Sequence, residues 1–361
     1  NTGGQFPCVQ CGADLKFAPG ETSLVCEYCG AKNQIQRKQV EIKENSLKLQ
    51  LSKMKDEPFE VEMIIDKCDQ CGAQVDHKPH TTASLCPYCG AAMVSTHQSI
   101  RQIKPAALLP FKLKVDEAKA AYKTWIRKLW FAPNALKKKA RIDEKFSGMY
   151  VPYWTFDANT NSSYTGERGD YYYVTRTRTV RDDDGSSRQE TYRERRTRWT
   201  SVSGHVHTNF DDLLVVATRS VERKYADKLE PWDLNSLVPY SNEYLAGFRA
   251  ESYQIDLKHS YRIAQQEMDH YIREVIERDI GGDEQVINNT DTDYGDPTYK
   301  HILLPVWICA YRFKGKLFQF LVNARTGEVH GDRPWSWIKI TLACLAGAAA
   351  IVAIVALIGE E

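Results

Sequence analysis

The sequence predicts an α+β protein with two small four-cysteine modules near its beginning and one apolar helix near its end. Three observations predict this organisation. Eight of the ten cysteines form four C-x-x-C pairs, in two sets of identical spacing. The middle of the chain alternates helical apolar patterns with strand-like runs, as a mixed α+β domain does. Ile340 to Ile358 is a run of nineteen residues without a charge.

The composition is that of an ordinary globular protein. The chain has 361 residues, of which 42% are hydrophobic and 26% charged, enough for two or three folded units. The formal net charge of +1 does not predict a polyanionic partner for the whole molecule, so local patches must carry any such prediction. Asn1 to Gln10 lack the basic and then apolar pattern of a signal peptide.

The cysteine pairs have the spacing of metal ligands. In each set, fourteen residues separate two C-x-x-C pairs, and a glycine follows each pair. Four thiolates in a closed shell suit structural zinc and leave no position for a water nucleophile, with an iron centre or redox dithiols as the alternative. The sequence therefore predicts two zinc ribbons, residues 1–34 and 63–97, each holding one Zn²⁺. The eight expected ligands are Cys8, Cys11, Cys26, Cys29, Cys68, Cys71, Cys86 and Cys89.

Residues around the ribbons are expected to be peripheral to the metal. His77 and His80 lie within the second ribbon, where four cysteines are already at hand, so we expect exposed loop residues. Residues 35–62 are highly charged, with apolar residues that alternate more than they follow a helical period. This pattern predicts a linker with some extended structure, and a short helix is the alternative.

A larger α+β domain is expected over residues 98–335. Apolar residues from Val115 to Trp130 recur at helical spacing until Pro133 ends the pattern. The lysine run 137–139 that follows is either a solvated face or a contact for phosphates or anionic headgroups. A second amphipathic helix is expected, with apolar residues from Leu257 to Val275 on one face and its end at Gly281-Gly282.

Strand patterns surround these helices. Met149 to Phe156 is rich in aromatic residues, and Tyr299 to Phe313 followed by Leu317 to Asn323 reads as a meander. The polar segment Asn288 to Pro297 is expected to be a loop. Val-Pro-Tyr-Trp at 151–154 is echoed by Leu-Pro-Val-Trp at 304–307, each after a long helix, which suggests a weak internal duplication.

Residues 170–206 predict a long polar hairpin. Its arms, Tyr171 to Arg181 and Arg188 to Val206, flank the turn 182–186. Arginines with interleaved aromatic residues are typical of a nucleic-acid surface, whereas the acidic residues among them favour cross-strand ion pairs on a protein interface or a plain surface. His205 and His207 lack a third ligand at fitting spacing. The eight arginines are Arg176, Arg178, Arg181, Arg188, Arg193, Arg195, Arg196 and Arg198.

Catalytic motifs are missing from the sequence. It contains no G-x-x-x-x-G-K-[ST] loop, no G-x-S-x-G, no H-E-x-x-H and no G-x-G-x-x-G. Cys309 falls in an apolar strand and Cys344 in the terminal apolar run, where a thiol is inert. We therefore expect neither an enzyme nor a small-molecule substrate.

The terminal apolar run predicts a transmembrane helix over residues 338–358. At about 1.5 Å per residue, nineteen residues extend roughly 28 Å, close to the thickness of a bilayer core. Trp335, Trp337 and Lys339 precede it, as expected at a headgroup boundary. Only three residues follow it, so we expect a tail-anchored protein whose bulk is cytoplasmic, in agreement with reduced cysteines. Ala343 and Gly347 form a small-xxx-small pair that permits a helix contact.

The chain resembles a family of bacterial membrane-anchored double zinc-ribbon proteins. Four features carry this resemblance: the paired C-x-x-C-G motifs, the two P-x-W motifs, the run Phe318 to Val329 and the terminal apolar run. Members are often labelled primosomal-helicase-like or transcription-factor-type zinc ribbon proteins. The helicase label does not carry over, because the phosphate loop is missing. The resemblance implies a place at the inner membrane and a partner of the flotillin/band-7 or phage-shock type.

Two functional hypotheses follow. The first is a non-enzymatic membrane adaptor that presents its ribbons and its α+β domain in the cytosol to another membrane-associated protein. The alternative is a membrane-tethered nucleic-acid-binding protein.

Overall fold

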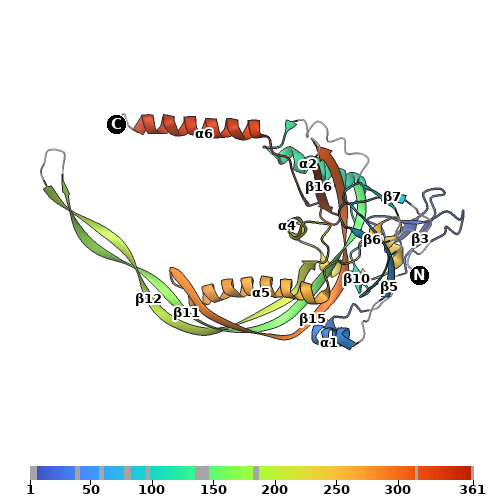
Figure 1. Ribbon diagram of the computed structural model, residues 1–361, viewed down its shortest axis with the longest axis horizontal. Coiled ribbons are helices and arrows are strands. Elements are labelled where there is room, and N and C mark those ends of the chain that lie inside the picture. Colours follow the sequence, from blue (N-terminus) through green and yellow to red (C-terminus); the bar gives the residue numbers. More distant parts are fainter. Residues whose placement is uncertain are drawn as a thin grey trace.

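The computed structural model describes residues 6–36, 41–56, 61–76, 83–94, 98–134, 146–181, 187–313 and 316–358. Figure 1 shows a long curved sheet with the ribbons at one end. A hairpin and the C-terminal helix α6 (Trp337–Ile358) project from the body to the same side. The mixed α+β architecture with antiparallel strands agrees with the sequence prediction.

The central sheet has nine strands, and three long antiparallel strands form most of it. β12 (Ser187–Val216) pairs with β11 (Phe146–Arg181), which also pairs with β15 (Glu284–Phe313). The shorter members are β4 (Asn45–Ser46), β10 (Ala107–Leu108), β13 (Val238–Pro239), β14 (Arg249–Ala250), β16 (Lys316–Asn323) and β17 (Val329–Gly331).

Each ribbon has its own small strands. Ribbon 1 is a three-stranded sheet, and ribbon 2 is built from a three-stranded and a two-stranded sheet. Pairing of β5 with β9 extends ribbon 2 beyond its expected boundary at residue 97. The strands are β1 (Lys16–Phe17), β2 (Ser23–Val25), β3 (Lys32–Gln34), β5 (Val61–Lys67), β6 (Gln74–Asp76), β7 (Ala83–Leu85), β8 (Ala92–Val94) and β9 (Gln98–Gln102).

Helix α5 (Leu257–Ile280) lies along the concave side of the long strands (Figure 1). Asp256 caps its first turn by accepting a hydrogen bond from the His259 amide at 2.7 Å, and Gly281, at φ 65°, ends it. Its buried residues recur about every fourth position and pack with Tyr164 and Val206 of the hairpin. The second predicted helix is thus confirmed, and it ends at Gly281 as expected.

One expectation about an irregular segment was wrong. Residues 288–297 are part of β15 and pair with β11 rather than forming a loop. Even the half-buried face of this segment carries polar side chains, among them Thr290, Thr292 and Tyr294, so its composition resembles that of a loop. In the linker, the expected extended structure is present as β4, and the alternative is present as well, because α1 (Leu47–Asp56) is a short helix anchored by the buried Leu47. The lysine run 137–139, the turn 182–186 and His77 and His80 lie outside the described residues.

The two P-x-W motifs lie side by side at the centre of the sheet. Val151 pairs with Leu304, its own counterpart, in an antiparallel register, so an approximate twofold axis relates the motifs. The carbonyl of Pro152 accepts a hydrogen bond from the Ala217 amide at 2.9 Å, and the carbonyl of Pro305 accepts one from Ala324 at 3.1 Å. Each proline therefore holds the same place against its return strand.

The tryptophans of the motifs interlock the two halves. Trp154 Nε1 donates to the Ile255 carbonyl at 3.1 Å, two residues before α5. Trp307 Nε1 donates to the Leu113 carbonyl at 3.0 Å, two residues before α2 (Val115–Lys128). The short strands show the same twofold relation: β10 pairs in parallel with β15, and β14 pairs in parallel with β11. The repeated helix and strands suggested by the sequence are present as two interlocked units.

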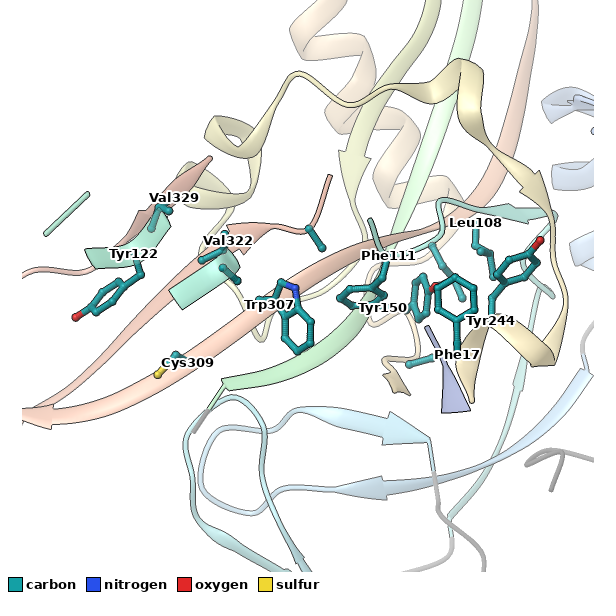
Figure 2. Close-up of a cluster of buried hydrophobic side chains, with 14 of the residues drawn as sticks. Phe17, Leu108, Phe111, Tyr122, Tyr150, Tyr244, Trp307, Cys309, Val322 and Val329 are labelled. Atoms are coloured by element: carbon teal, nitrogen blue, oxygen red, sulfur yellow. The ribbon is translucent and has the colours of Figure 1, made fainter. Parts of the chain in front are cut away.

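An aromatic cluster joins ribbon 1 to helix α2 (Figure 2). Phe17 of β1 contacts Tyr244 edge to face at 5.3 Å between ring centroids. At the other end of the cluster, Tyr122 of α2 stacks on Phe320 at 3.9 Å. Trp307 lies between these ends in Figure 2. Ribbon 1 is therefore packed into the core through its sheet.

His301 is a buried titratable group at the sheet centre. Its Nδ1 donates to the Ile103 carbonyl at 2.8 Å, and its ring lies 4.8 Å from that of Trp154. Burial lowers the pKa of His301 from 6.5 to about 4. The unfolded chain therefore takes up a proton that the folded protein excludes, and the stability contributed by the neutral ring is lost as pH falls from 6.5 toward 4.

We expect His301→Gln to remove this pH dependence, because an amide can keep the hydrogen bond to Ile103 without titrating. Between about pH 7 and pH 5, wild type should lose about 2 kcal/mol more unfolding free energy than the variant. Urea unfolding at both pH values measures the difference. Equal losses in the two proteins would contradict a neutral buried His301.

The predicted transmembrane helix remains a prediction. The described residues of α6 beyond Ile340 are exposed. Within the parts of the chain that the structure describes, no helix combines the length and apolar character needed to cross a membrane.

Candidate metal centres and docking surfaces

All four cysteine knuckles share one backbone conformation. The Gly12 amide donates to the Cys8 carbonyl at 2.8 Å, and the Cys8 amide donates to Ala13, also at 2.8 Å. The other three knuckles repeat both hydrogen bonds. The glycine of each knuckle has φ between 70° and 75°, where a side chain would be strained. The repeated C-x-x-C-G-A sequence thus specifies a turn that aims two sulfurs at one point.

The knuckles bring the eight predicted ligands together as two tetrads. In ribbon 1 the Sγ atoms of Cys8 and Cys29, and of Cys11 and Cys26, are 3.5 Å apart. The corresponding pairs in ribbon 2 are 3.6 Å apart, and each tetrad lies within 4.8 Å. A tetrahedral ion with metal–sulfur bonds of about 2.3 Å needs sulfurs roughly 3.8 Å apart. Both tetrads therefore fit a four-thiolate metal ion.

The charge balance of ribbon 2 also favours a cation among its thiolates. A hydrogen bond from Cys71 and the backbone amides of Cys89 and Tyr88 lower the pKa of Cys86 to about 5. The neighbouring Cys86 sulfur in turn raises the pKa of Cys71. The Cys86 thiolate thus forms readily, and its negative charge opposes ionisation of Cys71. Four thiolates therefore coexist only around a positive ion.

The two ribbons differ in what covers their second knuckle. In ribbon 2, Pro87 and Tyr88 are buried against the α+β domain. In ribbon 1, the counterpart of Tyr88 is Tyr28, whose side chain is 84% exposed. Val9 on the neighbouring knuckle is 85% exposed. Ribbon 1 packs through its sheet and leaves this knuckle face, defined by Val9 and Tyr28, uncovered by the described residues.

The Tyr88 hydroxyl lies in a cluster of hydrogen bonds around Glu251. The Tyr88 hydroxyl donates to the Glu251 carboxylate, which also accepts from Thr218 Oγ1 at 2.7 Å and from Gln254 Nε2 at 3.1 Å. Burial raises the pKa of Glu251 to about 7. Sequence reasoning missed Glu251. No motif in the sequence points to this carboxylate. In the internal repeat, Leu109 holds the backbone position that is equivalent to that of Glu251.

The arginine-rich hairpin has two unlike faces. The even-numbered face, which continues from the surface under α5, holds the ion pairs that the sequence suggested. Arg176 lies 2.6 Å from Glu194, and Arg178 lies 2.7 Å from Glu190. Arg196 also approaches Glu194, at 3.2 Å. The interpretation of cross-strand ion pairs therefore holds for this face.

His205 and His207 lie within β12, and among the described residues no third donor completes a metal site with them. Cys309 is buried in β15, and Cys344 is exposed on α6. The metal chemistry that the described residues support is confined to the two tetrads.

Comparison with known proteins gives one similarity over nearly the whole chain. The chain is 26% identical over 344 residues to the uncharacterized protein YdjG of Bacillus subtilis (strain 168), which covers 93% of this chain and 91% of that protein. No family model matches the chain, and no solved structure matches it.

Proposed function

We propose that this protein is a non-enzymatic adaptor held at a membrane, in which ribbon 1 docks a protein partner and α6 supplies the anchor. The observation that carries the proposal is the contrast between the two ribbons. Ribbon 2 is fastened to the body through its second knuckle, whereas the same face of ribbon 1 is open.

Zinc is the metal that suits this role. Four thiolates in a closed tetrahedron favour Zn²⁺, which has no redox chemistry and here no open position for a substrate. One Zn²⁺ would be held by Cys8, Cys11, Cys26 and Cys29, and a second by Cys68, Cys71, Cys86 and Cys89. Each ion would stabilise the fold of a module too small to fold by apolar burial alone.

The knuckle face of ribbon 1 suits a protein partner of definable chemistry. Tyr88 of ribbon 2 is received by apolar walls and by the acceptor Glu251. Tyr28 occupies the same position of the same module, with a ring and a hydroxyl available to solvent. A partner pocket with an apolar rim and a buried carboxylate would receive Tyr28 in the same way. Val9, in the place of Asp69 in ribbon 2, adds apolar contact area.

Helix α6 is the proposed anchor. Its side chains are apolar around the whole circumference, and Leu342, Leu345, Ile351 and Val352 are each more than 60% exposed. Such a surface in water is costly, and a bilayer is the medium that covers every side of a helix. By resemblance, the membrane is the bacterial inner membrane, with the ribbons in the cytosol.

Membrane insertion requires α6 to move. Figure 1 shows α6 and the hairpin projecting to the same side, so in this orientation a flat bilayer around α6 would include the arginine-rich arms. Each charged arginine at bilayer depth costs about 3 kcal/mol or more. The helix therefore turns about the segment 331–336 on insertion. The hydrogen bonds that Phe131 and Ala132 accept from Ser336 and Lys339, at 2.8 and 2.9 Å, would break.

The partner would be another membrane-associated protein, of the flotillin/band-7 or phage-shock type by resemblance. We expect the double variant Val9→Ser, Tyr28→Ser to co-purify at least about tenfold less partner protein than wild type does from native membranes in mild detergent. The reason is that the knuckle face then has no anchor residues. Quantitative mass spectrometry against wild type measures the loss.

Asp69→Ser is the matched control, since Asp69 is the exposed counterpart of Val9 in ribbon 2. It should co-purify the same protein at the wild-type level, and all three proteins should keep two zinc ions. Unchanged co-purification by the double variant would remove ribbon 1 from partner binding.

A further inference from the structure

We propose that the odd-numbered face of the distal hairpin binds single-stranded nucleic acid. This face, called here the odd face, consists of the odd-numbered residues of Tyr171–Arg181 and Ser187–Trp199. It is independent of the knuckle face of ribbon 1 and of the membrane anchor. Hydrophobic packing against α5 involves the even-numbered face, so the odd face points away from that helix.

The odd face is cationic and carries no acidic side chain between these limits. Its charged residues are Arg181, Arg193 and Arg195, and no carboxylate of the described residues pairs with them. The even-numbered face places Glu190 and Glu194 among its arginines. Each face has three more arginines than carboxylates, since Arg188 and Arg198 also lie on the even-numbered face. On that face Glu190 and Glu194 interrupt the positive charge and pair with three arginines, whereas no carboxylate interrupts the odd face, which is therefore the more uniform surface for a polyanion.

Exposed aromatic rings stand beside these charges. Tyr173 is directly opposite Arg195, and Trp199 is opposite Gly169 two rows further along the ribbon. Tyr173 is 63% exposed and Trp199 is 43% exposed. Residues two apart on a strand are separated by about 6.6 Å, so these rings and guanidinium groups follow one another along the same face of the hairpin. Aromatic rings that stack bases beside cations that meet phosphates are the usual elements of a single-strand site.

Two local contacts orient this surface. The Arg195 guanidinium lies over the Tyr171 ring at 4.2 Å, which holds the cation against the sheet. The Tyr171 hydroxyl donates to Glu284 at 2.8 Å, and this carboxylate marks the proximal limit of the surface. The remaining odd-face positions are mostly threonines, which are small and favour strands. These small side chains leave the backbone of the hairpin accessible to a ligand.

Single-stranded nucleic acid fits better than the alternatives. An anionic lipid surface accepts both arginines and aromatic rings in its headgroup region, but it is a plane, whereas the odd face is a narrow strip along two strands. A duplex has its bases already stacked. A single strand satisfies both the charges and the rings.

The test uses full-length protein in detergent and a fluorescein-labelled oligothymidine of about 20 nucleotides, followed by anisotropy between about 50 and 200 mM salt. The variant Arg181→Gln, Arg193→Gln, Arg195→Gln should bind at least about tenfold more weakly. Its slope of log affinity against log salt should fall by about 2, since each phosphate contact to a single strand contributes about 0.7. Tyr173→Ser should weaken binding roughly tenfold with an unchanged slope.

The matched control removes the same charge from the other face. Arg176→Gln, Arg178→Gln, Arg196→Gln should change affinity less than about twofold. Equal loss in both triple variants would reduce the effect to net charge and overturn the proposal. A duplex of the same length bound as tightly, or binding to phosphatidylglycerol vesicles without binding to the oligonucleotide, would also overturn it. Two zinc ions in every variant and an unchanged circular dichroism spectrum show that the fold is intact.

Discussion

Cys86→Ser is expected to lower the zinc content from two ions to one per chain and to destabilise the α+β domain as well as ribbon 2. A serine hydroxyl does not replace a thiolate ligand, and binding of a structural zinc ion contributes on the order of 10 kcal/mol to folding. Cys86 and its neighbour Tyr88 are buried in the same cluster as Met149 and Leu304 of the central strands. Loss of ribbon 2 therefore uncovers the centre of the sheet.

Cys26→Ser in ribbon 1 should also leave one zinc ion, but its damage should be more local. Ribbon 1 contacts the core through its sheet, and the tip of its second knuckle is exposed, so its unfolding vacates the contact of Phe17 with Tyr244 but no buried knuckle contact like that of Tyr88 with Glu251. Zinc measured with a chromogenic chelator, together with urea unfolding, distinguishes the two variants. Cys344→Ser is the control, because Cys344 lies on α6, and it should retain both ions. Two ions per chain in Cys26→Ser or Cys86→Ser would refute the four-thiolate sites.

The variant Ala348→Arg, Val352→Arg is expected to release the protein from membranes. Both residues lie on the exposed stretch of α6. An arginine near the centre of a membrane helix costs about 3 kcal/mol, so two cost about 6 kcal/mol, enough to reverse insertion of a moderately apolar helix. Fractionation of cells followed by alkaline carbonate extraction measures the membrane-bound share of the protein.

Ala348→Leu, Val352→Leu is the matched control, since it changes the same positions and keeps them apolar. This variant should remain in the membrane pellet after extraction. If the arginine variant also remained in the pellet to the wild-type extent, α6 would not be the anchor, and its exposed apolar surface would require a protein partner instead.

The two cysteine tetrads could be predicted because their information is local. Two ligands of each pair are three residues apart, and the glycine after them sets the turn that aims both sulfurs. Helix α5 was predicted for a similar reason, since its buried residues recur within one continuous segment that Gly281 ends. Both patterns lie within a stretch of sequence that folds as one unit.

The length of the hairpin was underestimated for a physical reason. β11 runs from Phe146 to Arg181, but only its first part alternates apolar and polar residues as a half-buried strand does. The distal part is mostly exposed on both faces, and residues 288–297 of β15 carry polar side chains even on their half-buried face, so backbone pairing alone identifies them as strands. Without an apolar face, a strand and a polar loop have the same composition.

The sequence by itself determined the two metal sites, the main helices, the arginine-rich hairpin and the apolar C-terminal run, because each depends on residues close together in the chain. Only the tertiary structure decided that Tyr88 is buried on Glu251 while Tyr28 is exposed, and that Arg195 and Glu194 lie on opposite faces of one ribbon. The physical reason is that burial and face depend on partners far away in sequence. Two nearly identical knuckles therefore have different environments, and neighbouring charges point in opposite directions.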